Sequence, residues 1–258
     1  MSNLIVNNEN GICTLTINRP ENLNVLNYES IEELLSFFTQ AKDNADIKVI
    51  ILTGAGSKSF VAGGDISKMA KADPQEAIAF ARKAQKLMRT METLPKPIIA
   101  AVNGFALGGG LEIALACDFI YASDNAKFGF PEVSLGIIPG FGGTQNLPRL
   151  IGANKTREMI FTGKMIDAEK AEKWGIVNHV STQENLMEDV LKTAKDIIKN
   201  GLIAVGYGKE CVDRGMNMSK EDAFLYESSL FGALFSTEDQ KEGMAAFLEK
   251  RKAEFKNR

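Results

Sequence analysis

The feature that most constrains this chain is a long apolar stretch in its middle, residues 97–122, which reads PIIAAVNGFALGGGLEIALACDFIYA. It is long enough to suggest a membrane span, yet it contains four glycines and the acidic residues Glu112 and Asp118. A carboxylate near the centre of a bilayer costs roughly 2.5–3.5 kcal/mol. We therefore predict that the stretch is the buried core of a water-soluble protein with no membrane partner.

Three segments of the first hundred residues predict strands. Residues 4–20 (LIVNNENGICTLTINRP) indicate two strands around a Glu-Asn-Gly turn, because CTLTI alternates and is rich in Thr and Ile. Residues 47–56 (IKVIILTGAG) and 97–102 (PIIAAV) are nearly continuous apolar runs of strand length. Such runs are typical of parallel strands covered on both faces. We therefore predict an α/β fold with a parallel sheet.

Helical periodicity fills the segments between these strands. Residues 27–44 begin at a candidate N-cap, Asn27 or Ser30, and residues 73–94 have Pro74 in their first turn. Helical patterns dominate the last hundred residues, at residues 153–161, 167–174, 186–199, 202–216, 219–235 and 237–256.

This distribution predicts two regions. We expect a core of residues 1–200, followed by a helical region of residues 201–258 that serves packing or assembly. We find no internal repeat of fixed period and no low-complexity segment.

Composition argues against several classes of protein. The chain has 45% hydrophobic residues, 24% charged residues and a net charge of −3, without the basic excess typical of nucleic-acid binding. Its three widely spaced cysteines fit neither a disulfide framework nor a paired metal knuckle, which favours a reducing cytoplasm. The first fifteen residues lack the basic and apolar regions of a signal peptide, so we expect no export.

The single histidine, His179, argues against several kinds of site. It has no acidic partner nearby in the sequence, so we expect a structural or surface role for it. Zinc sites and histidine-based triads need more His or Cys residues than the chain supplies. Residues 54–59 (GAGSKS) lack the third glycine of a dinucleotide-binding turn, and no GxxxxGK[ST] loop is present. We therefore predict no metal site and no use of NAD or ATP.

Three glycine clusters remain, AGGD (62–65), GGG (108–110) and PGFGG (139–143). Tight turns explain any one of them, but three together favour loops whose backbone N–H groups approach a ligand. Gly109 should lie at a helix N-terminus, where free N–H groups and the helix dipole stabilise an oxyanion. A second N–H, for which AGGD is the strongest candidate, would complete an oxyanion hole.

Two carboxylates, Glu112 and Glu132, lie in apolar sequence near these clusters. Burial would raise their pKa values toward neutrality, where acid–base catalysis is efficient, and two such groups facing one cavity could share a water. The alternatives are a buried salt bridge for Glu112 and a helix-cap or loop role for Glu132.

At these residues the sequence resembles the enoyl-CoA hydratase (crotonase) family. The similarity covers nearly the whole chain and is most like the bacterial short-chain hydratases, also called 3-hydroxybutyryl-CoA dehydratases. It is carried by NRPENLNVLN, SFVAGGDISKM, KPIIAAVNGFALGGGLEIALACDFIYASDNAKFGFPEVSLGIIPGFGGTQNLPRLIG and STEDQKEGMAAFLEKRKAEFK.

The resemblance implies a spiral of ββα units with C-terminal helices that trimerise, commonly as a dimer of trimers. It implies that Gly64 and Gly109 bind the thioester oxygen, and that Glu112 and Glu132 are the catalytic pair for reversible syn hydration of a trans-2-enoyl-CoA. Glu112 would activate water for C3, and Glu132 would deliver a proton to C2. Gly140 would help to place the water, and no cofactor beyond the CoA of the substrate is implied.

The same resemblance implies a CoA site built from two subunits. It places Ala62 and Ile66 on the adenine side and counts Asp65 among the CoA-binding residues. It places Phe231, Phe247 and Lys250 near the CoA phosphates and pantetheine, from a neighbouring subunit. The basic tail that carries Lys250 is otherwise read as a solvated helix end.

Several positions depart from the family pattern. Phe130 stands where relatives often have Gln, Asn146 where they have Arg, and Gly64 and Val25 where they have Ala. Phe130 is two residues from Glu132 and bears on the hydrogen bonding of that acid and on acyl preference. Enoyl-CoA isomerisation or another CoA-thioester reaction on this scaffold remains the alternative activity, and RNA binding by the basic tail is a weaker one.

Overall fold

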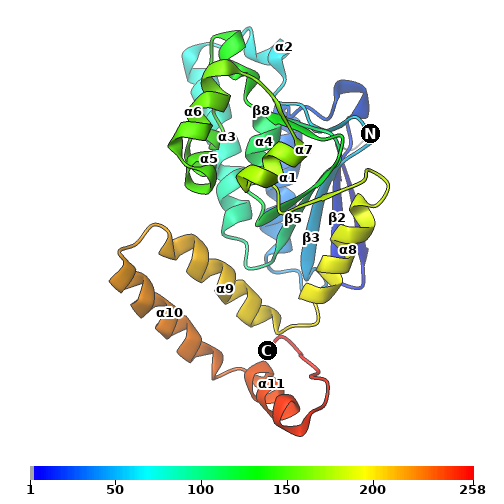
Figure 1. Cartoon of the computed structure of the whole chain (residues 1–258), viewed down its shortest axis with the longest axis vertical. Coiled ribbons are helices and arrows are strands. Elements are labelled where there is room, and N and C mark those ends of the chain that lie inside the picture. Colours follow the sequence, from blue (N-terminus) through cyan, green and yellow to red (C-terminus); the bar gives the residue numbers. More distant parts are fainter. Residues whose placement is uncertain (1–2) are drawn as a thin grey trace.

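Two β-sheets form the centre of the chain, and a computed structural model describes residues 3–258 (Figure 1). Residues 1–2 of the expected 1–200 core lie outside the described residues. The larger sheet has the strand order β1-β2-β3-β5-β7-β10 and the smaller one β4-β6-β8-β9. The strands are β1 (Leu4–Glu9), β2 (Ile12–Ile17), β3 (Val49–Gly54), β4 (Ser59–Val61), β5 (Ile98–Val102), β6 (Phe105–Leu107), β7 (Phe119–Ser123), β8 (Lys127–Gly129), β9 (Ile166–Asp167) and β10 (His179–Ser181).

From β3 to β8, consecutive strands alternate between the two sheets. β3, β5 and β7 are parallel neighbours in the larger sheet, while β4, β6 and β8, which follow them in the chain, are parallel neighbours in the smaller one. Helices then lead from each pair of strands to the next. This is the predicted winding of ββα units, and the parallel α/β fold is confirmed.

The N-terminal hairpin is also confirmed. β1 and β2 pair antiparallel from Leu4 opposite Ile17 to Glu9 opposite Ile12. Asn10 and Gly11 form the turn with φ values of 54° and 87°, a conformation that Asn and Gly adopt most readily.

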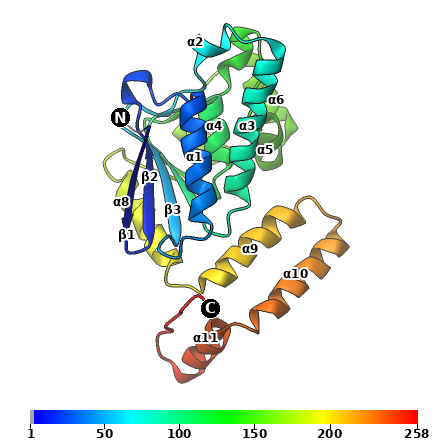
Figure 2. The ribbon, with the colours of Figure 1, turned by 180° about the vertical axis from the view of Figure 1, so that it is seen from behind.

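Helices α1 (Tyr28–Ala41) and α3 (Pro74–Glu92) lie side by side on one face of the larger sheet (Figure 2). Asn27 caps α1 in a reciprocal pair with Ser30, and Asp73 caps α3 with Pro74 in the first turn. The predicted starts of both helices are therefore confirmed.

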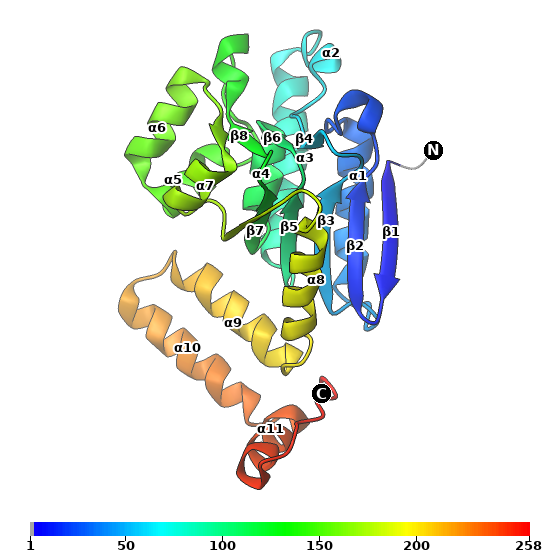
Figure 3. The same ribbon diagram turned by 45° about the vertical axis from the view of Figure 1, so that its right-hand side comes forward.

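Helix α8 (Leu186–Ile197) covers the opposite face of the same sheet (Figure 3). Ile50 and Leu52 of β3 belong to the main core, whereas Val49 and Ile51 of the same strand pack with α8. Burial on both faces explains the unbroken apolar run of this strand.

The remaining helices before residue 200 surround the smaller sheet. They are the 3₁₀ helices η1 (Pro20–Asn22) and η2 (Pro131–Leu135), and α2 (Ile66–Met69), α4 (Gly109–Leu115), α5 (Gly143–Ile151), α6 (Ala153–Thr162) and α7 (Ala168–Trp174). The glycine-rich segment VAGGDISKM (61–69) is typical of a loop, and its sequence did not predict α2. The short strands β4, β6, β8 and β9 were not predicted either. Elements of two to four residues leave no periodic pattern to detect.

Helices α9 (Leu202–Gly215), α10 (Lys220–Leu234) and α11 (Glu238–Glu249) extend away from the core (Figures 1 and 2). Lys209 of α9 fixes this extension by an ion pair with Asp118, at 3.0 Å, and by hydrogen bonds to the carbonyls of Met91 and Lys96. Close packing of Gly206 on Pro95 adds to this joint.

The prediction of a final helix through residue 256 is wrong. Helix α11 ends at Glu249, because Lys250 adopts a left-handed φ of 55°. The tail then folds back, and the carboxylate of Asp239 accepts hydrogen bonds from the N–H groups of Lys256 and Asn257. The charged composition of residues 250–256 did not indicate this turn, because tertiary contacts stabilise it.

Gly110 allows α4 to approach β4 closely, and this approach supplies a test of the fold. A Cβ at Gly110 would lie 1.8 Å from the Val61 carbonyl oxygen. We expect Gly110→Ala to lower the free energy of unfolding by more than about 3 kcal/mol, since neither backbone can retreat without disturbing the core. Denaturant unfolding measures the change. Gly208→Ala in α9 is the matched control, because a Cβ there meets nothing within 4 Å, and an equal loss in both variants would contradict the packing described.

Candidate active site

The carboxyl ends of β4, β6 and β8 place the predicted site residues next to one another. β4 leads to Gly64, β6 leads to Gly109 and Glu112, and β8 leads to Glu132. The three strands are parallel neighbours, so their carboxyl ends meet at one edge of the smaller sheet. This is where ligand sites form in α/β folds.

Glu112 lies in the first turn of α4 and is 2% exposed. Its Oε1 accepts hydrogen bonds from the N–H groups of Phe141 (2.8 Å) and Gly143 (2.7 Å). Burial raises the pKa of Glu112, and the N–H groups of Gly143, Phe141 and Gly142 act in the opposite direction. The site therefore holds a dehydrated carboxylate whose charged form is stabilised by backbone amides.

The alternative of a buried salt bridge is wrong. Across residues 3–258, none of the ion pairs involves Glu112. The nearby acid Asp118 is the one that takes a cation, Lys209, at the joint with α9.

Glu132 lies in the first turn of η2, with its carboxyl group against Gly108. Gly108 has a φ of 52°, and a Cβ there would come within 2.6 Å of Glu132 Oε1, so a side chain at this position would be strained and would displace the carboxyl group. Oε2 is buried and has no hydrogen-bond partner in the described part of the chain. Burial raises the pKa of Glu132 to about 7, its own backbone N–H opposes the shift, and the charge of Glu112 adds to it. The structure thus brings the two carboxylates close enough to interact.

Gly109 is the first residue of α4, so its N–H has no acceptor within the helix. A Cβ on Gly109 would lie 3.8 Å from the Gly63 carbonyl carbon. This distance places the start of α4 beside the AGGD segment.

Gly64 presents a second free N–H. Leu26 bridges to the residues on either side of it, donating to the Gly63 carbonyl (2.8 Å) and accepting from the Asp65 N–H (3.0 Å). Since backbone groups of adjacent residues in an extended segment point to opposite sides, the Gly64 N–H points away from Leu26. Within residues 3–258 no hydrogen bond occupies the N–H of Gly64 or of Gly109.

Aromatic rings that were not predicted as site residues cover this site. The Phe141 ring presses on Gly109, where a Cβ would lie 2.8 Å from it. Phe80 of α3 meets Phe141 edge-on at 5.3 Å between ring centroids and stacks with Tyr28 at 6.3 Å. Phe141 lies inside the PGFGG cluster. Phe80 and Tyr28 gave no signal in the sequence, because they belong to helices α3 and α1, which are distant from this cluster in the chain.

The PGFGG cluster has a role beyond the one expected for it. The N–H groups of Phe141 and Gly143 bind the Glu112 carboxylate, a role that the sequence did not reveal. Gly140 is positioned by its carbonyl, which accepts from Gln85 at 2.8 Å, and its assignment to water placement stays a prediction. The loop therefore orients an acid.

The packing of Phe130 also links it to Glu112, while its expected effect on Glu132 stays a prediction. The buried Phe130 ring lies against Gly143, where a Cβ would be 2.6 Å from it, and Glu112 Cγ lies on the same glycine at 3.0 Å. Phe130 is therefore a neighbour of Glu112 across Gly143. As a phenyl ring it supplies no hydrogen-bond donor to either acid.

The residues assigned to CoA binding fall into two groups. Ala62, Asp65 and Ile66 flank Gly64, and Asp65 caps α2 through Ser67. Phe231, Phe247 and Lys250 lie on α10 and at the end of α11, and Figures 1 and 3 show these helices far from α2 and α4. One chain does not bring the two groups together.

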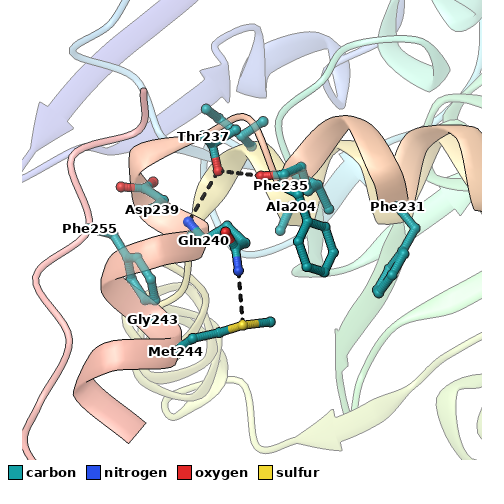
Figure 4. A pocket seen from close by; sticks show the side chains of 12 residues that line it. Ala204, Phe231, Phe235, Thr237, Asp239, Gln240, Gly243, Met244 and Phe255 are labelled. Carbon is teal, nitrogen blue, oxygen red and sulfur yellow. Dashed lines mark hydrogen bonds between the residues drawn. The ribbon is translucent and has the colours of Figure 1, made fainter. Parts of the chain in front are cut away.

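A cavity of about 260 Å³ lies within the helical extension (Figure 4). Phe231, Phe235 and Met244 line it, and Phe255 of the tail closes one side. It is separate from the Glu112 and Glu132 site.

His179 has an acidic partner after all. Its Nε2 lies 3.6 Å from Asp189 on α8, and its ring contacts Tyr121 at 5.2 Å between centroids. Asp189 follows ten residues later and is brought near by the turn into α8. The side chain is 49% exposed, in accord with the surface role predicted for it.

Within residues 3–258, no three His, Cys, Asp or Glu side chains gather as metal ligands. No helix in the same part of the chain combines the length and apolar character needed to cross a bilayer.

Comparison with known proteins matches residues 7–258 to the family model described as enoyl-CoA hydratase/isomerase. The chain is 47% identical to the short-chain-enoyl-CoA hydratase of Clostridium acetobutylicum, covering 100% of this chain and 99% of that one. It is also 47% identical to the crotonyl-CoA hydratase of Syntrophomonas wolfei, covering 98% and 97%. The crystal structure of an enoyl-CoA hydratase from Bacillus anthracis superposes with a TM-score of 0.96 at 38% identity, over 99% of this chain and 100% of that one. The chain therefore belongs to the enoyl-CoA hydratase/isomerase family.

Proposed function

We propose that this protein is a short-chain enoyl-CoA hydratase, which adds water reversibly across C2 and C3 of a trans-2-enoyl-CoA. The observation that carries the proposal is the meeting of two dehydrated carboxylates, Glu112 and Glu132, beside the free N–H groups of Gly64 and Gly109. The names of the two relatives at 47% identity support the same reaction and a short acyl chain.

In the proposed mechanism the thioester oxygen accepts hydrogen bonds from Gly64 and Gly109. These donors polarise the carbonyl and stabilise the enolate that forms when water attacks C3. Glu112 takes a proton from the water, and Glu132 gives a proton to C2. The pair carries one proton before and after this step, so the reaction runs in reverse by the same path.

The environments of the two acids support this division of roles. Burial raises the pKa of both acids, to about 7 for Glu132. Two backbone N–H groups favour the charged form of Glu112, whereas within residues 3–258 no donor reaches Glu132 Oε2. This difference suits Glu132 as the acid and Glu112 as the base. The chemistry needs only carboxylates and backbone amides, with CoA as part of the substrate.

The surface of the helical extension supports a homo-oligomer, a trimer or a dimer of trimers. Val212, Leu225 and Phe247 are 67%, 68% and 83% exposed in the single chain. Exposed apolar side chains gathered on one region are typical of protein interfaces. We propose that Phe231, Phe247 and Lys250 contact the CoA held by a neighbouring subunit, which would join the two groups of CoA residues.

The cysteines support a reducing, cytoplasmic location. Cys13 and Cys117 are buried and Cys211 is half-buried, and all three are free thiols.

Glu112→Gln and Glu132→Gln should each lower kcat for crotonyl-CoA hydration about 10²- to 10⁴-fold, because Gln keeps the shape of Glu but cannot transfer the proton. The double variant should lose little more, since the pair acts as a unit. Loss of the enoyl thioester absorbance measures the rate, and Glu184→Gln, at an exposed position, is the control. Full activity of either site variant would contradict the roles. A much faster turnover of a 3-enoyl-CoA would favour isomerisation.

The hydration rate should depend on pH through the shared proton. The pKa of Glu132 is raised to about 7, so the pair loses its proton, and kcat/KM falls, as the pH rises above about 7. Net hydration releases no proton, so dehydration must show the same pH profile, which belongs to the pair as a whole. Initial rates in both directions from pH 5 to 9 test this, and a flat profile above pH 7 would argue against Glu132 as the acid.

The mass in solution should correspond to three or six chains of 28.1 kDa. Burial of the exposed apolar side chains of the extension is the physical reason. Light scattering after size-exclusion chromatography measures this mass, and a monomer at micromolar concentration would contradict the assembly.

A further inference from the structure

The loop between β2 and α1 contains two successive non-glycine residues with left-handed backbone. Leu23 and Asn24 have φ values of 52° and 57°, and Asn24 is fully buried. Such conformations cost free energy and persist where the surrounding structure enforces them. Nothing in the proposed chemistry uses this loop directly, so its strain needs another explanation.

The side chain of Asn24 joins three segments. Its Oδ1 accepts from the Arg19 N–H at 2.9 Å, and its Nδ2 donates to the carbonyls of Ala55 (3.0 Å) and Ser59 (2.8 Å). Both amide N–H groups are used. Gly54 makes room for this side chain, because a Cβ there would lie 2.8 Å from Asn24 Nδ2.

The bonds from Asn24 continue along the chain to Gly64. Ser59 begins β4, and the Leu23 carbonyl accepts from Ser59 Oγ (2.9 Å) and from the Ala62 N–H (3.1 Å). Leu26 then bonds to the residues on both sides of Gly64. Residues 23–26 therefore run beside residues 59–65 and decide which way the Gly64 N–H points.

We infer that Asn24 is a positioning residue for the oxyanion donor at Gly64. The inference rests on the proposed function, in which the Gly64 N–H donates a hydrogen bond to the thioester oxygen. Asn24 does not touch the substrate. It fixes the start of β4 relative to the loop 23–26, so that the Gly64 N–H converges with that of Gly109 on one oxygen. Displacement of such a donor by about 1 Å is enough to slow an enzymatic reaction about 100-fold.

Two substitutions separate this role from a contribution to folding. Asn24→Gly removes the side-chain amide but adopts a φ of 57° without steric cost, so the loop can keep its path. Asn24→Asp keeps the shape and replaces the two N–H donors by a carboxylate facing two carbonyl oxygens. Thr193→Val is the matched control, since it removes a half-buried side-chain hydrogen bond to Tyr121 beneath α8, on the other face of the sheet.

The test measures hydration of crotonyl-CoA and the absorption band of bound 2,4-hexadienoyl-CoA. A conjugated thioester absorbs at longer wavelength when its carbonyl oxygen accepts stronger hydrogen bonds. We expect both Asn24 variants to lose about 10- to 100-fold in kcat, with KM changed less than about threefold, because the oxyanion contact strengthens in the transition state. The bound chromophore should shift less than in the unaltered protein, and Thr193→Val should match the unaltered protein in both measurements.

Loss of folded protein alone would lower the amplitude of the band and leave its position unchanged. An unchanged band position at saturation, or a kcat within twofold of the unaltered protein in both Asn24 variants, would overturn the inference. Failure of the unaltered protein to hydrate crotonyl-CoA would instead refute the proposed function.

Discussion

Inside this core, backbone N–H groups stabilise the Glu112 carboxylate in place of the water that burial removes. Glu112 is 2% exposed and forms no ion pair within residues 3–258, yet Phe141 and Gly143 each donate an N–H to the same oxygen. Burial of an unpaired charge would otherwise be compensated only by protonation. Burial raises the pKa of both acids, but within residues 3–258 Glu132 Oε2 has no such donor to oppose the shift. The difference between two similar acids is thus a difference in nearby N–H groups.

The glycines of the site are required by close approach. Gly108 leaves space for the Glu132 carboxyl group, Gly110 for the Val61 carbonyl, and Gly143 lies between Phe130 and Glu112. A methyl group at any of these three positions would meet an atom within 3.0 Å. The same closeness excludes solvent, so the packing that demands glycine is also what raises the pKa values of the acids.

The winding of the chain brings the acids and glycines of the site together. Because the strands from β3 to β8 alternate between two sheets, three short strands of the smaller sheet end side by side, each followed by one part of the site. The larger sheet, covered on both faces, supplies the rigid base, and α9 is joined to it through Lys209 and Asp118. A site on short strands keeps its geometry because the elements behind it cannot move independently.

The sequence by itself determined the long strands, the capped helices, the three glycine clusters and the two acids, because apolar periodicity, turn residues and isolated charges are local signals. The family resemblance also pointed to Gly64 and Gly109. Only the tertiary structure decided that PGFGG serves Glu112, that Phe80 and Tyr28 cover the site, and that Asn24 ties the loop before α1 to β4. These contacts join residues about 30 to 60 positions apart. Two of them use backbone N–H groups, which every residue but proline carries, so the sequence gives no sign of them.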